Sequence, residues 1–318
     1  MKILVAGGAG FVGSHLCDAL VEDGHHVLCA DNLVTGSARN IEQLRKHTRF
    51  QYLHHDITQP LDVACDAIFS LASPASPVGY REHAVPTLRV NSLGTMNLLE
   101  LAERQGARFL LASTSEVYGD PQVHPQPETY WGNVNPNGRR ACYDEGKRFA
   151  EAATMEWQRS RGVDARIVRI FNTYGPRNAL NDGRVMPNFI TQALCGEPLT
   201  VYGDGSHTRS FCYVSDLVAG LLAAMFSDAA NGEVYNLGNP DEFAIKELAQ
   251  VVLEIVGGRA EIAYEPLRFS DDPTRRRPDI TKARTELGWD VTVPLRQGLA
   301  RTIAWYRTQI QAPAAVGA

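Results

Sequence analysis

Positive charge and long apolar runs are both scarce in this sequence of 318 residues. Its 31 lysines and arginines are outnumbered by 36 aspartates and glutamates, so it lacks the general attraction to phosphate backbones or anionic membranes that a basic protein has. No apolar run approaches the roughly 20 residues that span a bilayer, and no signal-peptide pattern precedes the first strand. We therefore expect neither nucleic acid nor a membrane as a partner.

Cysteine is also sparse, and its spacing excludes a common type of metal site. The six cysteines are scattered, without the CxxC or Cys/His spacing of a zinc centre. We predict no metal, and this use of cysteine fits a reducing cytoplasm. The sequence has no internal repeat and no low-complexity linker, and only residues 312–318 are expected to form a disordered tail.

Apolar strands and amphipathic helices alternate through the first half of the chain. Strands that are apolar almost throughout are typical of a parallel sheet covered on both faces. The predicted strands are 2–6, 26–30, 67–72, 108–112 and 165–171, and the predicted helices are 11–22, 84–105 and 141–161. The fold class is therefore α/β, a doubly wound parallel sheet of the Rossmann type.

The regular alternation stops after residue 172, where loops rich in Gly, Pro and Asn begin. Strands are expected there at 199–202 and 234–237, and helices at 185–196, 215–227, 244–256 and 294–309. We predict a dinucleotide-binding domain over 1–172, to which segments near 210–240 return, and a smaller substrate-binding lobe over 173–311. Such a lobe would close over the carboxyl ends of the strands, where doubly wound sheets bind ligands.

A glycine loop lies directly between the first strand and the first helix. Gly7, Gly10 and Gly13 allow a tight turn and close backbone approach, and the helix N-terminus offers free N–H groups to a pyrophosphate. Many loops are rich in glycine, so this triplet alone is weak evidence. Asp31 strengthens it, because it ends the second strand 18 residues beyond Gly13, where a carboxylate can bind the adenosine ribose hydroxyls. That carboxylate would repel a 2′-phosphate, so the expected cofactor is NAD rather than NADP.

Tyr143 and Lys147 lie four residues apart on a predicted helix and therefore share one face. An ammonium group beside a phenol favours the phenolate and lowers its pKa, which makes the tyrosine a candidate general base. This spacing also occurs in ordinary surface pairs. The run Ser113-Thr114-Ser115-Glu116 supports the catalytic interpretation, because it follows the fourth predicted strand and so arrives at the same sheet edge. Glu116 is then expected to handle a proton or orient water rather than to cap a helix.

Longer segments resemble the UDP-glucuronate decarboxylases, also called UDP-xylose synthases, of the extended short-chain dehydrogenase/reductases. The resemblance runs from Gly7 to about Tyr306. It is carried by Leu71-Ala72-Ser73-Pro74-Ala75-Ser76-Pro77, Ser113-Thr114-Ser115-Glu116-Val117-Tyr118-Gly119-Asp120-Pro121, Val123-His124-Pro125-Gln126, Tyr130-Trp131-Gly132, Cys142-Tyr143-Asp144-Glu145-Gly146-Lys147-Arg148 and Asn181-Asp182-Gly183-Arg184-Val185. These segments are far more specific than a glycine loop or a Tyr/Lys pair.

The resemblance implies a reaction in which a sugar hydroxyl is oxidised only temporarily. Tyr143 would take the proton of the sugar 4-hydroxyl while hydride passes to NAD, and Thr114 or Ser115 would bind the developing ketone. The carboxylate would then be beta to a carbonyl, so loss of carbon dioxide leaves a stabilised enolate. Return of the hydride would give UDP-xylose. Glu116 resembles the residue that handles a proton or water in this family. Arg276 resembles the arginine that lies near the carboxylate in related decarboxylases.

The resemblance also implies a set of binding residues. Besides the glycines, Asp31, Tyr143 and Lys147, NAD would be bound by Phe11, Val12, Asn32, Thr35, Gly36, Asp56, Ile57, Leu71, Ala72, Ser73 and Asn91. The UDP-sugar would be bound by Tyr80, Arg89, Asn172, Arg184, Val201, Tyr202, Arg209 and Arg276. A basic run such as 275–277 is usually only a solvated face. Asp279 follows Arg276 at a spacing shared with sugar-nucleotide epimerases, where the arginine meets the diphosphate, and a guanidinium suits phosphate oxygens.

Three other functions remain open at this point. A UDP-glucuronate 4-epimerase needs the same oxidation, and this chain departs from the decarboxylase pattern at Arg89-Val90, around Tyr80 and at Met186-Pro187. A nucleotide-sugar 4,6-dehydratase is disfavoured, because Ser115 stands where the dehydratases carry an acidic aspartate. A non-catalytic NAD-binding regulator would leave the Tyr143/Lys147 pair unexplained. The helices at 84–105 and 141–161 match the pair through which the family dimerises, so we expect a homodimer.

Overall fold

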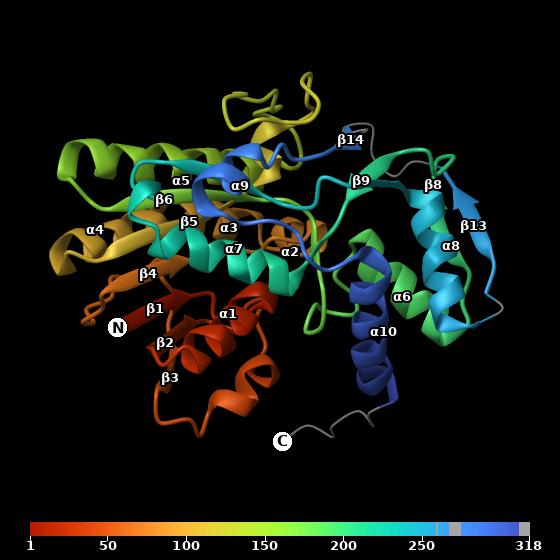
Figure 1. The fold of residues 1–318 in the computed structure, drawn as a ribbon, viewed down its shortest axis with the longest axis horizontal. Helices are drawn as coiled ribbons and strands as arrows, with labels where there is room; N and C mark the ends of the chain where they lie inside the picture. Colours follow the sequence, from red (N-terminus) through yellow and green to blue (C-terminus); the bar gives the residue numbers. More distant parts are fainter. Residues whose placement is uncertain (259, 267–274, 312–318) are drawn as a thin grey trace.

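A parallel sheet of seven strands organises the first part of the chain in the computed structural model, which describes residues 1–258, 260–266 and 275–311 (Figure 1). The strand order is β11-β6-β5-β4-β1-β2-β3, and every pairing is parallel. The strands are β1 (Lys2–Ala6), β2 (His26–Asp31), β3 (Phe50–His54), β4 (Ala67–Ser70), β5 (Arg108–Thr114), β6 (Ala165–Ile170) and β11 (Val234–Leu237). The predicted α/β fold class is confirmed. The order reverses between β1 and β4, which is where doubly wound sheets bind ligands.

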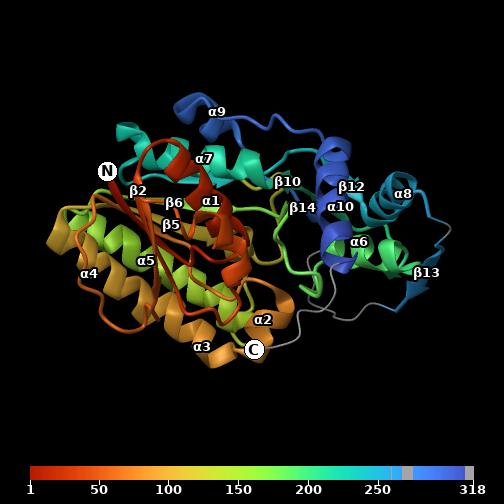
Figure 2. The same ribbon diagram turned by 90° about the horizontal axis from the view of Figure 1, so that it is seen from below.

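Helices cover both faces of this sheet, as the strands' continuous apolar character requires (Figures 1 and 2). One face carries α1 (Phe11–Glu22) and α7 (Val214–Phe226), which pack against each other. The other face carries α4 (Thr95–Gln105) and α5 (Ala141–Arg161). Within the described ranges no helix is both long enough and apolar enough to cross a membrane.

The predicted helix at 84–105 is interrupted near its middle. It consists of α3 (Ala84–Arg89), a π-helical turn at Val90–Gly94 and then α4. Asn91 lies in this turn, is 1% exposed, and donates from Nδ2 to Ser73 Oγ and to the Thr87 carbonyl, at 2.9 Å each. Single π turns inside helices occur frequently at functional sites. Here the turn connects the helix to the loop that follows β4.

The smaller lobe lies beside the carboxyl ends of the strands. Its helices are α6 (Val185–Cys195), α8 (Ile245–Val256) and α10 (Leu295–Gln311). Short strands complete it: β8 (Leu199–Tyr202) pairs with β13 (Ile262–Glu265), and β9 (Thr208–Ser210) lies between β12 (Glu242–Ala244) and β14 (Arg275–Arg276). The remaining α-helices and strands are α2 (Pro77–Glu82), β7 (Thr173–Tyr174), β10 (Cys212–Tyr213) and α9 (Thr281–Leu287). The described residues also form 3₁₀ helices at Ala38–Leu44, Ser115–Tyr118 and Asp228–Ala230.

The lobe and the sheet share one apolar core. A single cluster of buried residues runs from Val5 on β1 and Leu16 on α1 to Phe189 and Leu248 in the lobe. Segment 214–237 contributes α7 and β11 to the large domain. The division of the chain at residue 172 stays a prediction, and the tail predicted at 312–318 lies outside the described residues.

Candidate active site

A cavity of about 1320 Å³ lies between the sheet edge and the lobe. It collects segments that are far apart in the sequence, because the carboxyl ends of parallel strands meet at one edge. The predicted site residues that line it are Gly7, Gly10, Phe11, Val12, Gly13, Thr35, Leu71, Ser73, Tyr80, Thr114, Ser115, Glu116, Tyr143, Lys147, Asn172, Arg184, Tyr202, Arg209 and Arg276. Residues predicted to serve the cofactor and the sugar therefore share one cavity.

The glycine loop is packed so tightly that side chains would not fit. A Cβ on Gly13 would lie 2.2 Å from the Gly7 carbonyl oxygen, and one on Gly7 would lie 2.7 Å from the Ala72 nitrogen. Gly7 also has φ +82°, which favours glycine. Helix α1 begins directly after Gly10, so its first N–H groups face the cavity end of the loop.

Asp31 forms hydrogen bonds with the backbone of this loop and of the segment after β2. It is 7% exposed, and its carboxylate accepts hydrogen bonds from the Ala9 N–H at 3.0 Å and the Leu33 N–H at 2.8 Å. Burial raises the pKa of this carboxyl, against the lowering effect of the two hydrogen bonds. A Cβ on Gly36 would lie within 3.0 Å of both carboxylate oxygens. Asp31 thus holds the glycine loop, although it does not line the cavity itself.

Other predicted cofactor residues do not line the cavity. Ile57 is 3% exposed and Asn91 is buried against Ser73. Asn32 donates from Nδ2 to the exposed Asp56 at 3.2 Å, and Ala72 lies against the Gly7 backbone. Their predicted role in NAD binding stays a prediction.

Tyr143 and Lys147 lie in the cavity wall, but their pKa values differ from the expected pattern. Burial raises the pKa of Tyr143 to about 12, against the lowering effect of a hydrogen bond to Thr114. Burial also lowers the pKa of Lys147 to about 8. The Lys147 ammonium donates to the Ala112 carbonyl at 2.8 Å. The pKa of Tyr143 is thus raised and not lowered as expected, because desolvation of the phenol outweighs the lowering effects of the Thr114 hydrogen bond and the Arg184 charge.

Tyr80 packs on the candidate base. Its ring stacks on that of Tyr143 with centroids 5.2 Å apart and planes 9° from parallel. Tyr80 is 3% exposed, and its carbonyl accepts a weak hydrogen bond from the Cys142 thiol. The stack restricts the orientation of the Tyr143 ring in the cavity wall.

Glu116 is held as an anion by two arginines. Arg276 forms a bidentate pair with it, with Nη1 to Oε1 at 2.5 Å and Nη2 to Oε2 at 2.9 Å, and Arg140 also binds Oε2. Desolvation would raise the pKa of Glu116, but the charges of Arg276 and Arg140 outweigh it and bring the pKa to about 2. At neutral pH this carboxylate accepts hydrogen bonds and does not donate a proton. In this arrangement Glu116 is thus unsuited to donate a proton, but it can still orient a water molecule.

Asp144 lies behind this cluster. Its carboxylate is 3.8 Å from Arg140 Nε, and its Oδ1 has no hydrogen-bond partner among the described residues. Burial and the nearby negative charge of Glu116 raise the pKa of Asp144 to about 7. The pKa values of two carboxyls in one cluster therefore change in opposite directions: Glu116 stays ionised, whereas Asp144 holds its proton more tightly.

A backbone ladder fixes the segment that carries Arg276. Gln126 exchanges hydrogen bonds with Arg277: its N–H donates to the Arg277 carbonyl, and its Oε1 accepts the Arg277 N–H, at 2.9 Å each. The Asp279 N–H also donates to the Gln126 carbonyl at 2.9 Å. The loop after β5 therefore positions Arg276 against Glu116.

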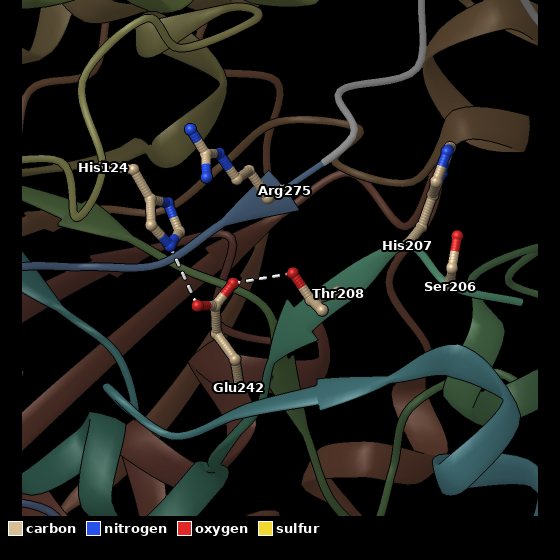
Figure 3. A pocket seen from close by; sticks show the side chains of 6 residues that line it. All are labelled: His124, Ser206, His207, Thr208, Glu242 and Arg275. Atoms are coloured by element: carbon tan, nitrogen blue, oxygen red, sulfur yellow. Dashed lines mark hydrogen bonds and ion pairs between the residues drawn. The ribbon is translucent and has the colours of Figure 1, made fainter.

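A second, smaller hollow lies beside this ladder (Figure 3). Its volume is about 570 Å³, and His124, Ser206, His207, Thr208, Glu242 and Arg275 line it. Figure 3 shows His124 and Thr208 facing the Glu242 carboxylate, at 2.9 and 2.7 Å, whereas Ser206 and His207 point away from it. The carboxylate is already paired, so we interpret these contacts as a link between the loop after β5 and strand β12.

Comparison with known proteins assigns the family. Residues 3–238 match the model of the NAD dependent epimerase/dehydratase family. The chain is 54% identical to UDP-glucuronic acid decarboxylase 1 of Xenopus tropicalis over 98% of its own length and 73% of that protein. It is 53% identical to UDP-glucuronic acid decarboxylase 1 of Arabidopsis thaliana, over 98% and 71% of the two chains. The chain belongs to the UDP-glucuronic acid decarboxylases.

A solved structure from a related branch has the same fold. The UDP-glucuronic acid 4-epimerase of Bacillus cereus, in complex with UDP-glucuronic acid and NAD, superposes with a TM-score of 0.88 at 29% identity, covering 97% of this chain and 100% of that one. The much higher identity to the decarboxylase family separates this chain from the epimerases.

Two residues that the sequence assigned to the sugar do not reach the cavity. Arg89 is exposed on α3 and is absent from the lining. Val201 is fully buried in the lobe, while its neighbours Thr200 and Tyr202 line the cavity. Strand side chains alternate between faces, so only one side of β8 can meet a ligand. A direct contact of the Arg89 or Val201 side chain with the sugar is not supported.

Sequence reasoning about this decarboxylase family member missed Arg140 and Asp144. Arg140 immediately precedes α5 and lines the cavity, and Asp144 directly follows Tyr143. Their spacing of four residues was a usable signal, since it places opposite charges on one side of a helix start. Such pairs are usually solvated, and only the fold shows that Asp144 is buried and Arg140 half-buried.

Proposed function

We propose that this chain catalyses the NAD-dependent decarboxylation of UDP-glucuronate to UDP-xylose through a UDP-4-keto intermediate, with NADH reoxidised within the same cycle. The observation that carries this proposal is the identity of 54% to a UDP-glucuronic acid decarboxylase over nearly the whole chain. The shared cavity supports it, because the glycine loop, Tyr143 and the Glu116–Arg276 pair all face one space.

The residues present fit a dinucleotide. The glycine loop forms a cradle that a single Cβ would fill, at the N-terminus of α1. Gly7, Gly10 and Gly13 would hold the pyrophosphate, with Ser73 and Lys147 nearer the reacting end. When bound, NAD would accept a hydride from the sugar C4, return it later, and contribute a positive ring that favours the Tyr143 phenolate.

Tyr143 would act on the sugar 4-hydroxyl. As the C4–H bond breaks, its phenolate would take the hydroxyl proton, and the hydroxyls of Thr114 and Ser115 would donate to the developing carbonyl oxygen. Both of these residues are buried in the cavity wall next to Tyr143. Lys147, held on the Ala112 carbonyl, would contribute positive charge to the same region.

The ketone would make loss of carbon dioxide feasible. The bond between C5 and the carboxylate carbon breaks, carbon dioxide leaves, and the electron pair is delocalised onto the C4 oxygen as an enolate. Protonation at C5 restores the ketone. Return of the hydride to C4, together with the proton held by Tyr143, would then give the pentose. Arg184 and Arg209 would balance the negative charge of the diphosphate and the carboxylate, whereas the charge of Arg276 is already paired with Glu116.

The decisive experiment incubates the purified protein with NAD and UDP-glucuronate labelled at the carboxyl carbon. Release of labelled carbon dioxide together with UDP-xylose is expected. Retention of the label in UDP-galacturonate would instead identify a 4-epimerase. Tight NAD binding without any change in the nucleotide sugar would favour a non-catalytic regulator.

The protein is further proposed to act as a homodimer. Three residues of the helix at 84–105 are exposed although apolar: Val85 at 65%, Leu88 at 43% and Leu93 at 43%. Phe149 on the adjacent helix α5 is also 43% exposed. Exposed apolar residues on two packed helices suit a helix-to-helix interface with a second copy.

A cytoplasmic location is the remaining part of the proposal. All six cysteines are free thiols, and four of them are buried. A protein without disulfides fits a reducing compartment. Growth of a tagged strain, followed by fractionation, would test this location directly.

A further inference from the structure

The loop after β7 crosses the outer side of the cofactor-binding helix. Residues 175–178, here called the strap, lead from β7 toward the lobe. Arg177 and Asn178 line the main cavity together with Phe11 and Val12 at the start of α1. The strap therefore forms part of the wall of the cavity that the glycine loop also lines.

Two side chains of α1 attach the strap to this helix. His15 donates from Nε2 to the Pro176 carbonyl at 3.0 Å, and Asp18 forms an ion pair with Arg177, with Oδ2 to Nη1 at 2.6 Å. His15 and Asp18 are three residues apart and so share one side of α1. The Asp18 carboxylate also accepts from Gln43 Nε2 at 2.7 Å, which fixes its orientation.

The other end of the strap is attached to the lobe. The Asn178 carbonyl accepts a hydrogen bond from the Tyr306 hydroxyl on α10 at 3.0 Å, and Asn178 is 4% exposed. The strap consequently connects α1, which begins at the glycine loop, with a helix of the substrate lobe.

Arg177 adopts a backbone conformation that needs support. Its φ is +67°, a region that side-chain-bearing residues other than Asn and Asp rarely occupy. Such a conformation persists only where surrounding contacts hold it, and it is frequent at functional sites. Among the described residues, the ion pair with Asp18 holds the Arg177 side chain through charge and not through an aligned hydrogen bond, because Nη1 has no hydrogen-bond partner there. Both side chains are 20% exposed, so the pair is partly shielded from water.

We propose that Asp18 and Arg177 are positioning residues that hold the strap against α1 and thereby retain the dinucleotide through the catalytic cycle. This inference rests on the proposed function, in which the same cofactor is first reduced and then reoxidised. If NADH left between the two steps, the ketone could not be reduced and a UDP-4-keto-pentose would be released. Retention of the cofactor thus decides which product appears.

The experiment measures NADH release without any sugar. The full-length protein is loaded with NADH, an excess of NAD is added, and the loss of bound NADH fluorescence gives the dissociation rate. Asp18→Asn keeps the shape of the side chain without its charge, and Arg177→Gly removes the guanidinium while suiting the positive φ. Each is expected to speed release by about threefold to tenfold, the range expected for loss of one partly shielded ion pair.

Three comparisons make the result specific. The exchanged pair Asp18→Arg with Arg177→Asp should restore slow release. Asp290→Asn, which breaks the exposed pair between Arg284 on α9 and Asp290 just beyond it, should leave the release rate unchanged. During turnover of UDP-glucuronate, Asp18→Asn should release more UDP-4-keto-pentose and free NADH than the wild type.

Release rates within twofold of the wild type for both single variants would overturn the role of the strap, whatever their thermal stability. The ion-pair explanation would also be overturned if Asp18→Asn releases NADH faster and the exchanged pair does not restore slow release. This test requires that the exchanged variant still binds NADH. If it does not bind NADH, Arg177→Lys takes its place as the variant expected to release NADH slowly. Changed release rates without any turnover by the wild type would refute the proposed function alone.

Discussion

Replacement of Asp144 by asparagine should stabilise the protein, and more so at higher pH. The wild-type carboxyl is 7% exposed, and burial and Glu116 raise its pKa from 3.8 to about 7. A change of this size corresponds to an upper limit of about 4 kcal/mol in the free energy of unfolding. Asparagine has nearly the same shape and carries no charge, so it avoids this cost.

The sign follows from the direction of the pKa change. The folded protein binds the Asp144 proton more tightly than the unfolded chain does, so ionisation of Asp144 destabilises the fold. This loss of folding stability is absent below the pKa of Asp144 in the unfolded chain. It grows as the pH rises above 3.8 and is complete once the pH exceeds about 7. The advantage of Asp144→Asn should therefore increase by about 2 kcal/mol between about pH 5.5 and about pH 8.5. Glu116, with a pKa of about 2, stays ionised across this window.

Denaturant unfolding of the cofactor-free protein, followed by tryptophan fluorescence at several pH values, measures this difference directly. Glu156→Gln is the control, because it removes a carboxylate from the same helix about three turns beyond Asp144, away from the Glu116–Arg276 cluster. A difference between Asp144→Asn and the wild type that is independent of pH, or a variant less stable at every pH, would refute the reasoning.

Three further outcomes are expected. Tyr143→Phe should abolish turnover and the transient NADH absorbance while NAD still binds, because only the phenol oxygen is lost; a fully active variant would exclude Tyr143 as the base. Gly13→Ala should weaken NAD binding by about tenfold or more, since its Cβ would lie 2.2 Å from a backbone oxygen. Gly10→Ala, with its nearest contact at 3.2 Å, should have a smaller effect in the same titration. Leu88→Asp should give monomers in sedimentation velocity, and an unchanged dimer would move the interface elsewhere.

The strongly periodic parts of the fold were predictable from the sequence. The strands at 2–6 and 26–30 and the helix at 11–22 have apolar patterns long enough to identify their type, and they are present as β1, β2 and α1. The strand β3 and helix α2 were missed. β3 is an edge strand in which only Phe50 is buried, so it has no continuous apolar run, and α2 is only six residues long.

The sequence by itself determined which chemical groups are available and which lie close through local geometry. The glycine spacing after a strand and the separation of four between Tyr143 and Lys147 require no knowledge of the rest of the chain. Only the tertiary structure decided how deep each group lies and which distant charge it meets. Arg276 pairs with Glu116 across 160 residues, which no local pattern can indicate. Burial likewise reversed the expected pKa change of Tyr143, because desolvation depends on everything packed around a group.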